Sequence, residues 1–91
     1  MVKVAKTLEI KNRLGLHARA AARLVQMVNR FSSEVKISKD GQLVNGRSIM
    51  GVLTLAATQG SKINVEAKGV DAQEALRAIE RLIEKKFYEK N

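Results

Sequence analysis

The single histidine of the chain, His17, lies in the stretch LGLHARAAARL, residues 14–24, two positions before Arg19. Residues before this stretch alternate between apolar and polar, whereas residues after it repeat at helical spacing, so His17 is expected at the start of a helix. The N–H groups of a first helical turn, here those of Ala18 and Arg19, have no partner within the helix. Together with the positive end of the helix dipole they form a site for an anion.

The residue types around His17 suit a phosphoryl group. The positive end of the helix favours the neutral, nucleophilic form of the imidazole. The guanidinium of Arg19 can hold two phosphate oxygens at once, and Arg13 and Arg23 add positive charge nearby in the sequence. Phosphoryl transfer depends on positioning and charge neutralisation more than on many catalytic groups. A lone histidine before a helix is more often a surface or capping residue without chemistry, and the residues alone leave both interpretations open.

A second segment, SIMGVLTLAA at residues 48–57, begins with a serine. As an N-cap, the hydroxyl of Ser48 would satisfy unpaired N–H groups of a following helix, which is the common role of serine there. The same hydroxyl could accept phosphate, whose charge the helix dipole would favour. Met50 and Leu53 are three residues apart, and this spacing slightly favours the core over an exposed apolar patch.

The hydropathy pattern predicts the elements that position these residues. Alternation indicates strands over residues 2–10, 34–38, 42–45 and 62–68, with a hairpin turn at Asp40-Gly41. Helical spacing indicates helices over residues 17–30, from Ser48 onward and after Asp71, where Asp71 and Glu74 form a capping pattern. Because the apolar strand faces are single-sided, the order β-α-β-β-α-β-α predicts an α+β two-layer sandwich, with one domain over residues 1–91.

The apolar stripes of the longer helices predict much of the core. The stripe of the first helix consists of Ala21, Leu24, Val25, Val28 and Phe31. The stripe of the last helix consists of Ala75, Leu76, Ile79, Leu82 and Ile83. The outer face of that last helix carries opposite charges three residues apart, Glu74–Arg77 and Arg77–Glu80, as expected of a solvated surface.

Composition excludes several classes of function. The chain has no cysteine and one histidine, so disulfides, thiol chemistry and a transition-metal site are not expected, and neither is a cofactor. The N-terminus carries charge and resembles neither a signal peptide nor a membrane span, which predicts a cytoplasmic protein without membrane insertion. The net charge of +8 would attract acidic proteins, phosphate groups or polyanions. Three dispersed aromatic residues are too few for a base-stacking platform, so nucleic acid is a distant alternative.

The motifs GLHAR at residues 15–19 and RSIMGVLTL at residues 47–55 closely resemble those of the histidine-containing phosphocarrier (HPr) family of the bacterial phosphoenolpyruvate-dependent phosphotransferase system. The resemblance covers nearly the whole chain. It implies an open-faced sandwich, a four-stranded antiparallel sheet with three helices on one face. It also implies that His17 accepts a phosphoryl group on Nδ1 from phosphorylated Enzyme I and passes it to an Enzyme IIA domain. The chain would then be a carrier rather than an autonomous enzyme.

The resemblance also implies roles for other residues. Arg19 would steady the phosphate, together with the backbone of Ala18 and Arg19. Ser48 would be a regulatory serine modified by HPr kinase/phosphorylase. Met50 and Leu53 would form an exposed docking patch, which reverses the preference for the core. We also expect two further arginines to contribute to docking, Arg23 and Arg47.

The chain departs from the family pattern at three points. Alanine stands at position 20 where the family has proline, which predicts a looser turn before the helix. Gly46 and Arg47 replace a leucine and a lysine, which thins the docking patch and weakens the case for the serine kinase. The strong positive charge suits acidic partners or a regulatory paralogue, for example in a nitrogen branch, in place of a sugar-transport carrier. With no obvious seam for association, a monomer is expected.

Overall fold

The computed structural model describes residues 2–89 and contains the predicted elements in the predicted order. These are β1 (Val2–Glu9), α1 (Ala18–Val28), β2 (Glu34–Lys39), β3 (Gln42–Asn45), α2 (Ile49–Thr54), β4 (Lys62–Gly69) and α3 (Ala72–Glu84). A short 3₁₀ turn, η1 (Lys86–Tyr88), follows α3. Within residues 2–89, no helix is long and apolar enough to cross a membrane.

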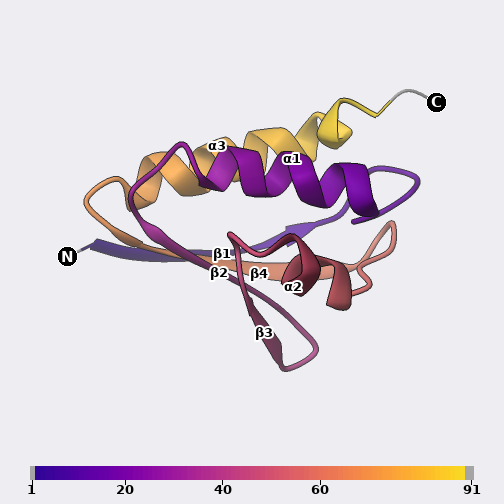
Figure 1. Ribbon diagram of the computed structural model, residues 1–91, viewed down its shortest axis with the longest axis horizontal. Coiled ribbons are helices and arrows are strands. Elements are labelled where there is room, and N and C mark those ends of the chain that lie inside the picture. The colour runs from indigo at the N-terminus through magenta and orange to yellow at the C-terminus, as the bar shows by residue number, and fades with distance from the viewer. Residues whose placement is uncertain (1, 90–91) are drawn as a thin grey trace.

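The strands form one sheet in the order β1-β4-β2-β3, in which all neighbours are antiparallel. β4 is central and pairs with β1 from Val2↔Gly69 to Glu9↔Lys62. Figure 1 shows α1 and α3 running together along the sheet at the top of the view, with the shorter α2 lower down, near β3 and β4. The predicted α+β open-faced sandwich is therefore confirmed.

The core lies between the sheet and the helices, because alternate strand residues face the helical stripes. Ile63, Val65 and Ala67 of β4 are buried as predicted. Leu24 and Val28 of α1 are also fully buried in the same core. Burial of each large side chain contributes about 1.5–3 kcal/mol, so these stripes fix how the helices sit on the sheet.

The predicted hairpin turn joins β2 to β3. Asp40 and Gly41 both have positive φ, 51° and 84°, as a two-residue type I′ turn requires. This turn sets the register of β2 and β3, in which Lys39 pairs with Gln42 and Ser38 with Leu43.

The predicted capping role of Asp71 is wrong. Its side chain makes no capping hydrogen bond at α3 within the described chain. The carboxylate accepts hydrogen bonds from the backbone N–H groups of Ser32 and Ser33, each at 2.9 Å, and from the Ser33 hydroxyl. The Ser33 hydroxyl, together with the N–H of Ser32, lowers the pKa of Asp71 below its ordinary value. Donors from a loop distant in sequence thus compete successfully with the local helix N-terminus.

One of the charge pairs predicted on α3, Arg77–Glu80, gives way to an ion pair between Glu80 and a residue distant in sequence. Lys6, which interrupts the apolar face of β1, reaches over to α3, where its Nζ lies 2.6 Å from Oε2 of Glu80. Glu80 is therefore paired with a strand residue and not with Arg77. This contact explains how a lysine is accommodated on the helix-covered face of an edge strand.

Candidate functional site

The loop between β1 and α1 is held against the segment that connects α2 to β4. The N–H of Leu16 donates to the carbonyl of Ala57 at 2.9 Å. The preceding Gly15 has φ +66°, and a Cβ at this position would lie 2.3 Å from the Ala57 oxygen. Only glycine combines this conformation with so close an approach. The close contact at Gly15 therefore fixes where the chain enters α1 and so where His17 lies.

His17 occupies the N-cap position of α1, as predicted. Its backbone is extended, with φ −74° and ψ 179°, and its carbonyl accepts the N–H of Ala21 at 2.8 Å. Its imidazole makes no capping hydrogen bond to the described backbone, so the ring is not used as a cap. The first-turn N–H groups, from Ala18 to Ala20, have no acceptor within the helix. At position 20, where proline would lack an N–H, alanine supplies one, and the looser turn predicted before the helix stays a prediction.

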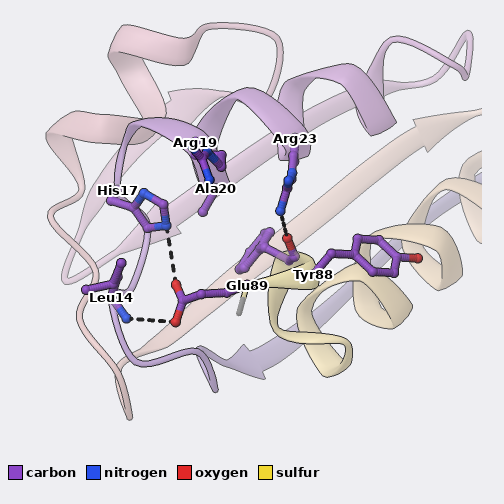
Figure 2. Close-up of a pocket in the computed structure, with 8 residues that line it drawn as sticks. Leu14, His17, Arg19, Ala20, Arg23, Tyr88 and Glu89 are labelled. Carbon is purple, nitrogen blue, oxygen red and sulfur yellow. Dashed lines mark hydrogen bonds and ion pairs between the residues drawn. The ribbon is translucent and has the colours of Figure 1, made fainter. Parts of the chain in front are cut away.

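His17 lines a pocket of about 370 Å³ between the start of α1 and the end of the described chain. Figure 2 shows Arg19 and Arg23 along α1 on one side of this pocket and Glu89 on the other. The full lining consists of Leu14, His17, Arg19, Ala20, Arg23, Phe87, Tyr88 and Glu89. The structure thus brings together three of the predicted site residues, His17, Arg19 and Arg23.

Glu89 is the site residue that the sequence analysis missed. Its Oε1 lies 3.3 Å from Nε2 of His17 and accepts a hydrogen bond from Nδ2 of Asn12 at 2.9 Å. Its Oε2 accepts from the backbone N–H of Leu14 at 3.4 Å, and the carboxylate side chain is only 8% exposed. The hydrogen bond from Asn12 lowers the pKa of Glu89, an effect to which Leu14 and His17 add and which burial opposes. The carboxylate is therefore held in its ionised form beside the imidazole.

Both arginines predicted for docking make structural contacts. Arg23 donates through Nη1 to the backbone carbonyl of Phe87, a residue that is buried in the core. Arg47 donates to the carbonyls of Val28, Phe31 and Ser33 and to the side chain of Asn29 at distances from 2.8 to 3.3 Å. Arg47 thereby ties the loop after α1 to the segment before α2. A docking role for either residue stays a prediction.

The second motif forms the start of α2. The Oγ of Ser48 accepts the N–H of Gly51 at 2.9 Å, which confirms the predicted N-cap. Met50 is 73% exposed, whereas Leu53 is partly buried against the core. Leu14 and Ile49 are also exposed apolar residues, at 63% and 41%, which the sequence analysis did not single out. Their signal in the sequence was an apolar residue at a turn or on the outer side of a short helix.

The arrangement around His17 is suited to holding a phosphoryl group. His17 and Arg19 line one open pocket at the start of α1, and the first amides of this helix have no acceptor within it, so an anion beside the imidazole would lie close to positive charge. In residues 2–89, no group of three histidine, cysteine, aspartate or glutamate side chains is placed to bind a metal ion.

Comparison with known proteins agrees with this chemistry. The family model described as "PTS HPr component phosphorylation site" matches residues 4–85. The phosphocarrier protein HPr of Cupriavidus necator is 50% identical over 80 residues, which cover 88% of this chain and 90% of that protein. The HPr-like protein Crh of Halalkalibacterium halodurans is 50% identical over 82 residues, or 90% and 98% of the two chains.

Among solved structures, the crystal structure of HPr-C-His from Thermoanaerobacter tengcongensis has a TM-score of 0.90 and 46% identity, with all of both chains covered. The match therefore extends from the two motifs to the whole fold. The chain belongs to the HPr phosphocarrier family of the phosphotransferase system.

Proposed function

We propose that the protein is a phosphoryl carrier that accepts the group on Nδ1 of His17 from phosphorylated Enzyme I and passes it to an Enzyme IIA domain. The observation that carries this proposal is the position of His17. This residue is the N-cap of α1, and it lines the same pocket as Arg19. At this position the positive charge of the helix start and of Arg19 can offset the charge of the phosphoryl oxygens.

The shape of the site suits a carrier better than an autonomous enzyme. The pocket is open, and His17 itself is partly exposed, so a partner protein can bring its own reacting group to the imidazole. Exposed apolar residues, Met50, Leu14 and Ile49, offer contact area for such a partner. The net charge of +8 favours encounters with acidic partner surfaces. We propose that the carrier works as a cytoplasmic monomer.

The test is phosphorylation with purified Enzyme I and labelled phosphoenolpyruvate. The protein should gain one phosphate that is labile in acid and stable in alkali, as expected of phosphohistidine. His17→Ala should gain none, and Arg19→Ala should be labelled more slowly because the charge that offsets the phosphoryl oxygens is lost. An unlabelled wild type, or equal labelling of His17→Ala, would show that the proposal is wrong.

A second candidate is a regulatory paralogue whose phosphorylation state controls partner proteins. It is favoured by the 50% identity to an HPr-like protein Crh, which equals the identity to the phosphocarrier of Cupriavidus necator. The two functions differ in a bacterial strain that lacks its own carrier. A sugar-transport carrier should restore sugar uptake in that strain, whereas a regulatory paralogue should be phosphorylated on His17 without restoring uptake.

Ser48 is proposed as a second, regulatory phosphorylation site for HPr kinase/phosphorylase. Its hydroxyl is partly buried and accepts a hydrogen bond from the Gly51 N–H, so the oxygen that would be phosphorylated is the same one that caps α2. A phosphate there would be favoured by the positive helix end. Incubation with the kinase and ATP should label the wild type and not Ser48→Ala.

A further inference from the structure

The end of the described chain folds back onto the start of α1. Three consecutive residues, Lys86, Phe87 and Tyr88, have positive φ values of 56°, 55° and 57°. Residues other than glycine adopt this left-handed conformation only at an energetic cost, so the surrounding contacts must hold it in place. The reversal brings Glu89 into the pocket that contains His17.

Contacts on both sides of the reversal hold Glu89 in position. Phe87 is 1% exposed and is part of the hydrophobic core, and its carbonyl accepts a hydrogen bond from Arg23 of α1. Asn12, which is fully buried, donates its side-chain amide both to the carboxylate of Glu89 at 2.9 Å and to the carbonyl of Gly15 at 2.8 Å. The same buried amide therefore links Glu89 to the loop that positions His17.

From this geometry we propose that Glu89 is a positioning residue for His17: its carboxylate faces Nε2, keeps the ring proton on that nitrogen and leaves the lone pair of Nδ1 free for the phosphoryl group. The inference rests on the proposed function, because it assigns a role in the same transfer. A carboxylate that orients a histidine through its second nitrogen is a general device that fixes both tautomer and ring orientation. The separation of 3.3 Å suits an unloaded site, since such contacts tighten when the reacting group is bound.

The charge balance of the transfer gives Glu89 a second effect. The lone pair of Nδ1 forms the bond to phosphorus, while the bond from phosphorus to the donor atom of Enzyme I breaks and its electron pair stays with that atom. Because the proton remains on Nε2, the phosphorylated ring carries a positive charge. The ionised carboxylate of Glu89 offsets this charge, and in the onward transfer to Enzyme IIA the neutral ring is regenerated with its proton still on Nε2.

The decisive comparison uses Glu89→Gln, which keeps the size of the side chain and removes its charge. Glu84→Gln is the matched control, because it removes the same charge from an exposed position on α3. With wild-type Enzyme I and phosphoenolpyruvate, kcat for phosphorylation of Glu89→Gln should fall roughly 10-fold or more, the scale of the loss when a carboxylate that orients a metal-bound histidine is removed, with KM little changed. Glu84→Gln should behave as wild type in both parameters.

A second readout does not depend on phosphorylation. In the unmodified protein, under conditions in which the imidazole is neutral, the ring ¹⁵N chemical shifts of His17 should show the proton on Nε2 in the wild type and in Glu84→Gln. In Glu89→Gln the shifts should move toward a mixture of tautomers. Thermal unfolding of all three proteins verifies that each is folded.

The outcomes separate the two proposals. If the wild type is labelled on His17 but Glu89→Gln has the same kcat and the same ring shifts, Glu89 has no positioning role and the inference fails. Faster labelling of Glu89→Gln would likewise overturn it, because the carboxylate would then obstruct the site. If the wild type is not labelled on His17, the proposed function fails, while the ring shifts still test the contact with Glu89.

Discussion

Replacement of Gly15 by alanine tests whether the close contact with Ala57 holds the site loop in place. At φ +66° an alanine costs about 1–2 kcal/mol. Its Cβ would in addition lie 2.3 Å from the Ala57 oxygen, so the loop must move and the 2.9 Å hydrogen bond from Leu16 would be lost or lengthened. A broken bond of this kind adds about 0.5–1.5 kcal/mol, or up to about 3 kcal/mol where the buried donor is left unpaired. We therefore expect Gly15→Ala to lower the free energy of unfolding by about 1.5–5 kcal/mol.

Gly60→Ala is the matched control for this measurement. Gly60 also has a positive φ, +87°, but a Cβ there would have no neighbour within 4 Å, so the variant carries the conformational cost alone. In urea unfolding its loss should be about 1–2 kcal/mol. In a domain of this size, each kcal/mol of difference corresponds to about 4–8 °C in Tm. Equal losses in Gly15→Ala and Gly60→Ala would refute the reasoning, because they would show that the approach to Ala57 does not constrain the loop.

Three other substitutions test separate features of the fold. Asp71 has a lowered pKa, so its contribution to stability is present above its ordinary pKa of 3.8 and is lost as the pH falls through its pKa in the folded protein. The Tm of the wild type should therefore fall on acidification, and the Tm of Asp71→Asn should depend less on pH. Arg47→Met should lower the free energy of unfolding in urea by about 2 kcal/mol, because several acceptors lose a charged donor, whereas the exposed Arg77→Met should change it by less than about 0.5 kcal/mol. Ala20→Pro should retain a Tm within a few degrees of the wild type and full phosphorylation by Enzyme I, because proline is tolerated in a first helical turn, and unfolding of this variant would contradict the helix start seen here.

Local sequence signals were sufficient to predict the elements and several residues at their starts, although α1 ends at Val28 where the helical spacing predicted residue 30. The alternating and helical hydropathy periods predicted the order of strands and helices, since burial of one face stabilises each element. Asp40-Gly41 predicted a hairpin turn, and Ser48 predicted an N-cap, because in both cases the relevant geometry spans only a few residues. His17 was placed at the start of α1 for the same reason. Its chemical role needed more than local pattern, and a resemblance across the whole chain was required to favour it.

The contacts that the sequence analysis predicted wrongly or did not predict are those between polar side chains and partners distant in sequence. Asp71 was expected to cap the helix that follows it, but donors from the loop before β2 engage its carboxylate. A docking role for Arg47 stays a prediction, but no pattern in the sequence indicated that its guanidinium bonds the end of α1 and the loop that follows. A charged side chain near a turn has several possible partners of similar energy, and only the tertiary structure decides between them. Propensity and periodicity carry no information about that choice.

The contact between Asn12 and Glu89 is the extreme case, because the two residues are 77 positions apart in sequence. Neither residue belongs to a motif. The reversal that brings them together uses three consecutive residues with left-handed backbone, and none of them is a glycine, the residue type that would have indicated a turn in the sequence. Such a conformation persists only where core packing and hydrogen bonds more than offset its cost, as burial of Phe87 does here. A reactive group such as His17 can therefore be predicted from its residue type and its place at a helix start. The groups that orient it can be identified only from the tertiary structure, because their contacts join residues distant in sequence.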